Sequence, residues 1–420
     1  MNPQTLAQKL IARSAGRGRV EPGEIVTCKV DLAMFHDSSG PRRLKPMLEE
    51  LGAQIWDKSK VVLVMDHYVP ERDEESRKIV RIAREWAREQ ALPHVYDSQG
   101  ICHVVVPQGG HIRPGMFCVG GDSHSPTGGA FGAYMFGIGA TEMLGVVVTG
   151  EIWLRVPHTI QMHWDGRLTP GVCAKDMMLH MIGRFGMNGG QYQAVEFAGP
   201  TVQALGMQER MTLSNMSAEL GAQVGLIAPD DTTRDWLRAT GTTVQDDASW
   251  CTDEGATLTR HDFDAAALAP QVAAPHSPAN SRAVEAFAST PIDVAYIGAC
   301  TGAKLADLRA AASVLRGRKT ASGVRLIVAP ASQHDQAAAE REGVMQVLRE
   351  AGARIAATAC GACAGYGDAL EGAGNVISST ARNFKGRMGS AETQVHLASP
   401  YTVAASAVAG RVCDPREMLA

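Results

Sequence analysis

Short apolar runs rich in β-branched residues alternate with amphipathic stretches along most of the chain. The runs at 61–65 (VVLVM) and 294–297 (VAYI) are apolar throughout, as is typical of strands buried on both faces of a parallel sheet. Between residues 74 and 90, apolar side chains recur every three or four positions among charged ones, which predicts an amphipathic helix. Strands separated by helices predict an α/β fold with largely parallel sheets.

The same patterns predict further elements and a division into domains. Further strands are expected at 94–96, 104–106, 324–329 and 354–358, and further helices at 141–154 and 304–315. At 420 residues, the chain is too long for one ordinary hydrophobic core. We expect three domains, at 1–157, 158–285 and 286–420. An Ala-, Pro- and Ser-rich stretch at 267–291 is the predicted linker between the last two.

Composition and charge narrow the classes of partner. A net charge of −4 without a basic stripe argues against binding to nucleic acid or to an anionic membrane. No apolar stretch approaches the ~20 residues of a membrane-spanning helix, and the N-terminal residues lack the apolar core of a secretory signal. Nine cysteines in 420 residues are too few for a disulfide scaffold. We therefore expect a cytoplasmic protein whose cysteines are ligands, nucleophiles or core residues.

A glycine-rich turn follows the small apolar run at 117–119. Its sequence, GGDSHSPTGGA, would place Asp122, Ser123 and His124 at the carboxyl end of a strand, where α/β sheets bind ligands. Asp122 near His124 is suited to hold an imidazole in one tautomer. A turn capped by an aspartate, with a surface histidine, explains the same residues equally well.

Two other histidines occupy similar positions. Asp66 and His67 end the strand predicted at 61–65, and His103 follows QGIC at 99–102. A single histidine at a strand end is more often structural than catalytic. Three such histidines, two of them with an aspartate close by, favour hydration and dehydration chemistry, because a leaving hydroxyl must be protonated.

Three of the nine cysteines differ from the rest in their surroundings. Cys360 and Cys363 form a C-x-x-C among glycines and alanines, and Cys300 follows the strand predicted at 294–297. Three thiolates suit a [4Fe–4S] cluster in which one iron lacks a protein thiolate and acts as a Lewis acid. A redox C-x-x-C pair and half of a zinc site stay open as alternatives. The other six cysteines are expected to be core residues.

Two arginines, Arg382 and Arg387, flank a short turn in the segment RNFKGRMG at 382–389. Two guanidinium groups near one turn can bind carboxylates in a bidentate manner. Ordinary solvated surface charge would give the same pattern, so the arginines alone do not decide between the two interpretations.

Taken in chain order, these segments resemble the aconitase family of iron–sulfur hydro-lyases. The resemblance covers most of the chain. It rests on seven motifs: DH at 66–67, QGICH at 99–103, GGDSHSPTGGAFGA at 120–133, SNMSAELGA at 214–222, ACT at 299–301, ACGACAG at 359–365 and RNFKGRMG at 382–389. It implies three α/β/α domains packed around a central cluster, and the dehydration and rehydration of a hydroxy-di- or tricarboxylic acid.

The resemblance also implies roles for individual residues. Cys300, Cys360 and Cys363 would ligate the cluster. The catalytic residues would be Asp66, His67, His103, Asp122, His124 and Glu219, with Glu219 orienting the hydroxyl or water on the open iron. The residues that contact the substrate or the cluster region would be Ser123, Asn215, Arg382 and Arg387.

The length of the chain refines this expectation. Single-chain aconitases are considerably longer because they carry a fourth, swivelling domain, and only residues 390–420 follow the last motif. We therefore expect that domain on a separate small subunit, which would supply the catalytic base and complete a heterodimer. The chain is most similar to the shorter large subunits of 3-isopropylmalate dehydratase and homoaconitase. This similarity implies a role in amino-acid biosynthesis, with 3-isopropylmalate or a related substituted malate as the substrate.

Gly302 and Ala381 depart from the family pattern, which usually has Asn at both positions. Losing two amides near the cluster would alter its hydrogen bonds, and thereby its potential or stability. Methylmalate or dimethylmalate dehydratase, homoaconitase and aconitase therefore stay open as alternatives. An apo aconitase-like protein that binds RNA is the alternative of a different class, and the net charge of −4 argues against it.

Overall fold

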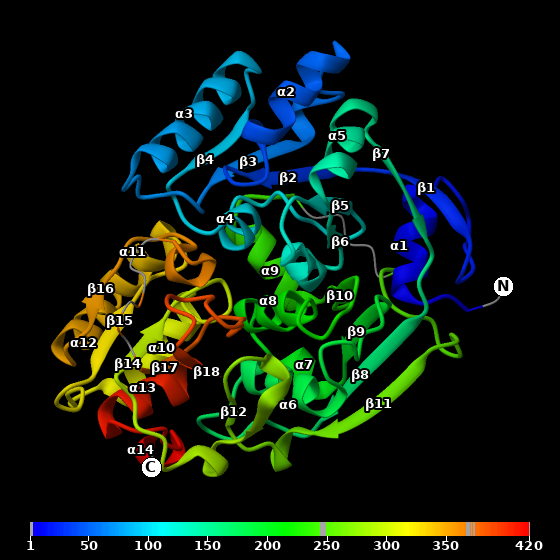
Figure 1. The fold of residues 1–420 in the computed structure, drawn as a ribbon. Coiled ribbons are helices and arrows are strands. Elements are labelled where there is room, and N and C mark those ends of the chain that lie inside the picture. The colour runs from blue at the N-terminus through cyan, green and yellow to red at the C-terminus, as the bar shows by residue number, and fades with distance from the viewer. Residues whose placement is uncertain (1–2, 244–248, 367–369, 371, 373, 420) are drawn as a thin grey trace. The chain divides into compact units, whose positions relative to one another are not determined.

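The structure is a computed structural model that describes residues 3–243, 249–366, 370, 372 and 374–419 (Figure 1). The chain forms two units that interleave along the sequence. Unit 1 comprises Met1–Asp97, Val105–Asp165 and Gly190–Phe263. Unit 2 comprises Ser98–Val104, Gly166–Gly189 and Asp264–Ala420. The division into three domains at 157 and 285 stays a prediction.

The main sheet of unit 1 has the strand order β4-β3-β2-β5-β6, and all neighbouring strands run parallel. Its strands are β2 (Leu32–His36), β3 (Val61–Met65), β4 (His94–Asp97), β5 (Phe117–Gly120) and β6 (Tyr134–Gly137). Every residue of β2 and β3 is buried, as the continuous apolar sequence of β3 predicts. The helices that follow β2, β3 and β6 are α2 (Pro41–Leu51), α3 (Glu74–Glu89) and α5 (Ala140–Thr149).

A second sheet of unit 1 has the order β10-β9-β8-β11, in which β8, β9 and β10 run parallel. Its strands are β8 (Thr159–Asp165), β9 (Ala194–Ala198), β10 (Val224–Leu226) and β11 (Thr259–Asp264). A separate antiparallel ribbon pairs β1 (Ile25–Lys29) with β7 (Glu151–Arg155). The other helices of this unit are α1 (Leu6–Ser14), α7 (Pro200–Ala204), α8 (Met207–Met216) and α9 (Asp231–Ala239).

Unit 2 is built on one sheet with the order β13-β12-β18-β17-β14-β15-β16. The strands from β18 to β16 run parallel, whereas β12 pairs antiparallel with both β18 and β13. The strands are β12 (Gln271–Ala273), β13 (Ser281–Ala283), β14 (Val294–Ile297), β15 (Arg325–Val328), β16 (Arg354–Ile355), β17 (Asn375–Ser378) and β18 (Gln394–Ala398). The helices are α6 (Ala174–Phe185), α10 (Leu305–Leu315), α11 (Gln333–Arg341), α12 (Val344–Glu350), α13 (Pro400–Ala409) and α14 (Arg416–Leu419).

The α/β class and the parallel sheets confirm the prediction from the hydrophobic pattern. The strands expected at 61–65, 94–96, 294–297, 324–329 and 354–358, and the helices at 74–90 and 304–315, are present within a few residues. Among the described residues, no helix is both long and apolar enough to cross a membrane.

Of the six cysteines expected in the core, Cys173 is only half-buried and Cys251 is exposed, because the chain places them outside the packed interior. Three predictions about local structure are also wrong. The run at 104–106 lies in the helix α4 (Cys102–Gln108) rather than in a strand. The helix expected at 141–154 ends at Thr149, because Gly150 adopts the left-handed conformation with φ of 73° and the chain then enters β7. The stretch 267–291 is not a bare linker, because it contributes β12 and β13 to the sheet of unit 2.

Candidate active site

Acidic and imidazole side chains lie at the ends of three strands, at one edge of the main sheet of unit 1. The strands β3, β2 and β5 are neighbours and parallel, so the residues that follow them share that edge. The residues are His36 and Asp37 at the end of β2, Asp66 and His67 after β3, and Asp122, Ser123 and His124 after β5. The predicted strand-end positions of Asp66, His67, Asp122 and His124 are thereby confirmed.

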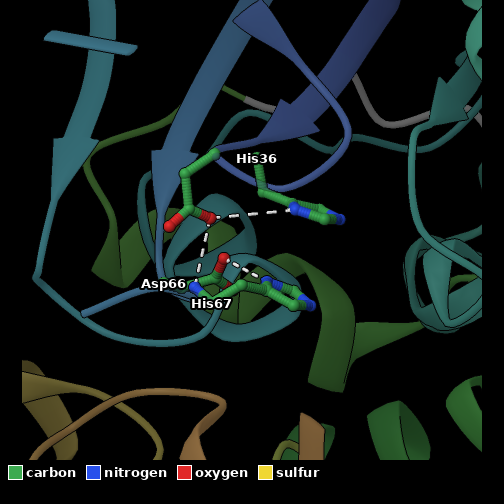
Figure 2. A group of neighbouring side chains, drawn as sticks. His36, Asp66 and His67 are labelled. Atoms are coloured by element: carbon green, nitrogen blue, oxygen red, sulfur yellow. Dashed lines mark hydrogen bonds and ion pairs between the residues drawn. The ribbon is translucent and has the colours of Figure 1, made fainter. Parts of the chain in front are cut away.

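The pair formed by Asp66 and His67 is a hydrogen-bonded ion pair (Figure 2). Nδ1 of His67 donates to Oδ1 of Asp66 at 2.7 Å, and the Asp66 side chain is fully buried. Burial lowers the pKa of His67, but the Asp66 carboxylate, helped by Asp122 and Asp37, outweighs burial and raises that pKa to about 10. His67 is therefore an imidazolium at neutral pH and can serve as a proton donor.

Asp37 holds the turn that carries this pair. Its fully buried carboxylate accepts hydrogen bonds from the backbone N–H groups of His67, at 3.1 Å, and Tyr68, at 2.8 Å. Burial, and next the neighbouring Asp66 carboxylate, raise the pKa of Asp37. A buried carboxylate that accepts two backbone hydrogen bonds fixes the direction in which His67 leaves the strand.

His36 is a site residue that the sequence reasoning missed. Its ring stacks on that of His67, with centroids 3.9 Å apart, and its Nε2 lies 3.6 Å from Oδ2 of Asp122. A repeated pattern in the sequence could have identified it: LAMFHD ends in a His-Asp pair, just as VVLVMDH ends in Asp-His. Because β2 and β3 are parallel neighbours, equivalent strand ends bring the two pairs together.

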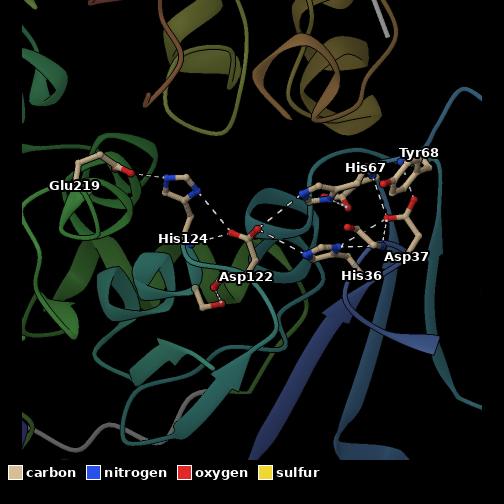
Figure 3. Close-up of polar contacts among 10 residues, drawn as sticks. His36, Asp37, His67, Tyr68, Asp122, His124 and Glu219 are labelled. Atoms are coloured by element: carbon tan, nitrogen blue, oxygen red, sulfur yellow. Dashed lines mark hydrogen bonds and ion pairs between the residues drawn. The ribbon is translucent and has the colours of Figure 1, made fainter. Parts of the chain in front are cut away.

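Asp122 lies among three imidazoles (Figure 3). Its Oδ2 is 3.6 Å from Nε2 of His36 and 3.7 Å from Nε2 of His67, and its Oδ1 is 3.6 Å from Nδ1 of His124. The backbone N–H of His124 also donates to Oδ1 at 2.8 Å, which fixes the carboxylate in place. One carboxylate thus connects two histidine positions that are far apart in sequence.

Glu219 completes this chain of charges. Nε2 of His124 donates to Oε1 of Glu219 at 2.9 Å, and the glutamate side chain is fully buried. Asn215, in α8, donates to Oγ1 of Thr127, which in turn donates to the backbone oxygen of His124. The SNMSAELGA segment therefore packs directly on the turn that carries His124. Ser123, in the same turn, is exposed.

The glycines of the turn permit this close packing. A Cβ at Gly120 would overlap the hydroxyl of Ser125, which donates to the backbone oxygen of Asp122. A Cβ at Gly129 would overlap the backbone oxygen of Gly225, in β10. These two positions exclude any side chain, so the glycines serve close approach rather than flexibility.

The predicted cluster residues belong to unit 2. The strands β17, β14, β15 and β16 are consecutive and parallel, so the loops after them leave one edge of that sheet. Cys300 lies after β14 and is 7% exposed. Cys360 and Cys363 lie after β16, at the short 3₁₀ turn Gly361–Ala364, and Cys363 is 5% exposed.

The arginine segment follows β17 at the same edge. A Cβ at Gly365 would lie 3.1 Å from the backbone oxygen of Arg387, so the C-x-x-C turn and the arginine turn are adjacent. Within the described part of the chain, the buried Nε of Arg387 has no hydrogen-bond partner, as expected of a donor that awaits a ligand. Asn383 anchors the segment by donating to the backbone oxygens of Ala274 and Val395.

His103 also belongs to unit 2. It is 4% exposed and lies in the first turn of α4. The backbone N–H of Ile101 donates to the backbone oxygen of Ala331, which ties this turn to the loop after β15. Unit 1 therefore brings together Asp66, His67, Asp122, His124, Asn215 and Glu219, and unit 2 carries His103, the three cysteines and the two arginines.

The donor set of unit 2 fits an iron–sulfur cluster. Iron–sulfur clusters are held by cysteine thiolates. The three cysteines lie in two loops that leave the same edge of the sheet. The neighbours of the C-x-x-C are small, and a Cβ at Gly361 would meet no atom nearer than 3.9 Å, so the turn has space beside its thiols. The roles of the individual residues stay predictions.

Comparison with known proteins identifies the family of this chain. The model of the aconitase family (aconitate hydratase) matches residues 8–292 and 285–410. The 3-isopropylmalate dehydratase large subunit 1 of Methanopyrus kandleri is 42% identical, over 99% of this chain and 100% of that protein. The large subunits of the same name from Moorella thermoacetica and Desulfatibacillum aliphaticivorans are 40% and 38% identical, each over 99% of both chains.

A solved structure has the same fold. The aconitase X of Thermococcus kodakaraensis, in its holo-form, superposes with a TM-score of 0.53 over 87% of this chain and 88% of the other. At a sequence identity of 14%, this structural similarity shows a shared fold and nothing finer. The family match and the full-length relatives are the stronger evidence for the family of this chain, since both span nearly all of it. The chain belongs to the aconitase family, and it is a hydro-lyase of the aconitase type.

Proposed function

We propose that this chain is the large subunit of a [4Fe–4S] hydro-lyase or isomerase that dehydrates and rehydrates a hydroxy-dicarboxylic acid, with 3-isopropylmalate or a related substituted malate as the substrate. The observation that carries the proposal is the continuous path of imidazoles and carboxylates from Asp66 to Glu219 in unit 1. The names of the full-length relatives support the choice of substrate.

His67 is the acid in this proposal. An imidazolium whose pKa is raised to about 10 stays protonated at neutral pH, and its Nε2–H faces the Asp122 carboxylate 3.7 Å away. A hydroxyl placed between these two groups receives the proton from Nε2 as its bond to carbon breaks. Asp66 stabilises the imidazolium before the transfer and keeps Nδ1 protonated after it.

His124 and Glu219 position the departing water in this proposal. Glu219 accepts from Nε2 of His124, so the Nδ1 side of that ring faces Asp122. A buried carboxylate fixes the tautomer and the ring orientation of a histidine in this way. Water that is released near Asp122 is thereby held by fixed groups and is ready for rehydration at the neighbouring carbon.

Cys300, Cys360 and Cys363 would hold the cluster in unit 2, and Arg382 and Arg387 would bind substrate carboxylates. When bound, the cluster supplies a Lewis acid that polarises the substrate hydroxyl. The buried, unpartnered Nε of Arg387 supports a carboxylate-binding role for the arginine segment. Keeping the thiols at the edge of a rigid parallel sheet limits their movement when ligands are exchanged.

A separate small subunit would supply the base. Dehydration also requires a group that removes a proton from the carbon next to a carboxylate. His67 is already protonated at neutral pH and acts as the acid, so the base must be a different group. The full-length relatives are named large subunits, which supports a second chain as its source.

The proposal is tested by turnover of the reconstituted pair. The chain is loaded anaerobically with iron and sulfide, mixed with a swivel-domain small subunit and assayed with 3-isopropylmalate, methylmalates, dimethylmalate, homocitrate and citrate. We expect formation of an unsaturated acid from a substituted malate, with a loss of ~10²-fold or more in His67→Gln. His334→Gln, at an exposed position, is the matched control.

Two results would contradict this proposal. One is a loaded pair that turns over none of these acids, and the other is an His67→Gln variant with wild-type turnover. Preference for homocitrate or citrate over every malate would keep the reaction but overturn the assigned substrate class. Turnover by the large chain alone would refute the role given to the small subunit.

A further inference from the structure

A buried lysine lies at the base of the two loops that carry the predicted cluster ligand Cys300 and the predicted substrate ligand Arg382. Lys175, in the first turn of α6, is 1% exposed. Its ammonium group donates to the backbone oxygens of Thr380, at 2.7 Å, and Ser379, and to Oγ1 of Thr301, at 3.3 Å. These three acceptors match the three N–H groups of an ammonium.

These contacts join loops that are far apart in sequence. Thr301 directly follows Cys300, after β14, and Thr380 lies two residues before Arg382, after β17. The hydroxyl of Thr301 also donates to the backbone oxygen of Ser379 at 3.1 Å. The Ser379 hydroxyl in turn accepts from the backbone N–H of Gly298 at 2.9 Å. Lys175 is therefore the charged centre of a network that fixes the position of one loop relative to the other.

No carboxylate among the described residues forms a direct ion pair with Lys175, and its three hydrogen-bond partners are neutral. Asp307, whose carboxylate raises the pKa of Lys175, accepts a hydrogen bond from Nζ of Lys304 at 2.7 Å instead. Burial lowers the pKa of Lys175 to about 8, against the attraction of Asp307 and of the Cys173 and Cys363 sulfurs.

Burying an ammonium group without a counter-charge is unfavourable, because the group loses its hydration. Hydrogen bonds to neutral oxygens offset part of this cost, and an anion close by would offset more. A cluster held by three thiolates carries a net negative charge. One of its predicted ligands, Cys300, directly precedes Thr301, which accepts a hydrogen bond from Lys175. Within unit 2, this makes the loaded cluster the natural counter-charge of the lysine.

We propose that Lys175 is a positioning residue for the iron–sulfur cluster: it fixes the Cys300 loop against the Arg382 loop, and its positive charge stabilises the cluster in its more reduced, more negative state. The inference rests on the proposed function, because it requires the cluster. It concerns the cluster's potential and retention rather than substrate chemistry. Lys175 itself is placed in contact with neither the substrate nor the iron.

The test separates the charge of Lys175 from its hydrogen bonds. Lys175→Met removes both, Lys175→Gln keeps a neutral donor, and Lys175→Arg keeps the charge. Lys319→Met, at an exposed position of the same unit, is the matched control. Each chain is loaded anaerobically, its iron and sulfide are counted, and its potential is measured by a redox titration followed by electron spin resonance. Far-UV circular dichroism checks the fold of each apo chain.

The expected result is a more negative reduction potential in Lys175→Met and Lys175→Gln, because removing a positive charge disfavours the added electron. Lys175→Met should also lose iron faster than the wild type, whereas Lys175→Gln should retain it better than Lys175→Met. Lys175→Arg and Lys319→Met should keep the wild-type potential. If Lys175→Met does not fold, the potentials of Lys175→Gln and Lys175→Arg decide the matter.

Equal potentials in Lys175→Gln and Lys175→Arg would overturn the inference. A wild-type chain that takes up no cluster would instead overturn the proposed function, so the two failures are distinguishable. If Lys175→Arg also loses the wild-type potential while both variants fold, charge is not the decisive property, and the inference fails in that case too.

Discussion

The imidazole of His36 lies parallel to that of His67, with ring centroids 3.9 Å apart and an angle of 11° between the planes. The two Nε2 atoms face the same Oδ2 of Asp122, at 3.6 and 3.7 Å. The stacked ring of His36 therefore limits the directions in which the proton on Nε2 of His67 can point. In the proposed reaction, His36 positions the acid His67, while Asp66 maintains its charge.

Replacing His36 by Ala should lower turnover without unfolding the chain. The loss of the stacked ring lets the His67 ring turn away from Asp122, and displacements of about 1 Å can cost up to ~10²-fold in rate. The measurement is kcat and KM of the reconstituted pair. We expect most of the change to be in kcat rather than in KM. A variant whose KM alone rises would show that His36 binds the substrate rather than orienting His67.

Replacing Asp66 by Asn should move the alkaline limb of the pH–rate profile to lower pH. Asp66 raises the pKa of His67, so without its charge the imidazolium loses its proton at a lower pH. Measuring kcat as a function of pH for both proteins tests this. An unchanged alkaline limb would mean that a group other than His67 is the acid.

The same pair gives a prediction for stability. Because the pKa of His67 is raised to about 10 in the folded chain, its contribution to the free energy of unfolding is complete below the unfolded pKa of about 6.5 and is lost as pH rises towards 10. Urea unfolding at neutral and at alkaline pH should show a smaller alkaline loss in Asp66→Asn than in the wild type. An equal loss in both proteins would contradict the assigned ion pair.

Glu219→Gln should reduce turnover by ~10²-fold or more while the chain stays folded. The amide can still accept from Nε2 of His124, but it no longer supplies the negative charge that orients that ring. Glu219→Ala should be less stable as well, because it leaves buried polar groups without a partner. Wild-type turnover in Glu219→Gln would show that the charge has no part in the reaction.

Gly302→Ala should destabilise the chain by about 1–3 kcal/mol, because the new Cβ would overlap the hydroxyl and the backbone oxygen of Ser379. The Asn that the family usually has here would need still more room. Gly145→Ala is the opposite control: nothing lies within 4 Å of its Cβ, and it lies inside α5, so it should stabilise by about 0.5–1 kcal/mol. Denaturant unfolding measures both, and equal effects would refute the packing explanation.

The buried strands β3, β14 and β15 could be predicted because burial on both faces requires uninterrupted apolar runs. The chemistry at their ends followed from that prediction, since Asp66 and His67 directly follow β3. His36 was missed because its strand, LAMFH, contains no β-branched residue, so the hydrophobic pattern did not indicate a strand that ends there. Only the pairing of β2 with β3 and β5 shows that it joins the other histidines.

The errors have local causes. Val104 to Val106 favour a strand by propensity, but they are buried in α4, where tertiary packing outweighs propensity. The end of α5 depends on a single glycine, Gly150. The apolar pattern continues past this residue, so the pattern alone did not mark it as the end of the helix. The contacts of Lys175 could not be predicted, because its partners are 126 to 205 residues away in sequence.

The most direct test of the account is a measurement of iron and acid-labile sulfide in the anaerobically loaded chain, together with its spin-resonance spectrum, in the wild type and in Cys360→Ser. Cys251→Ser, at an exposed position outside the motif, is the matched control. The account predicts roughly four irons and four sulfides per chain in the wild type and the control, and a large loss in Cys360→Ser. A wild-type chain that binds zinc instead of iron, or a Cys360→Ser chain with an unchanged cluster, would contradict it.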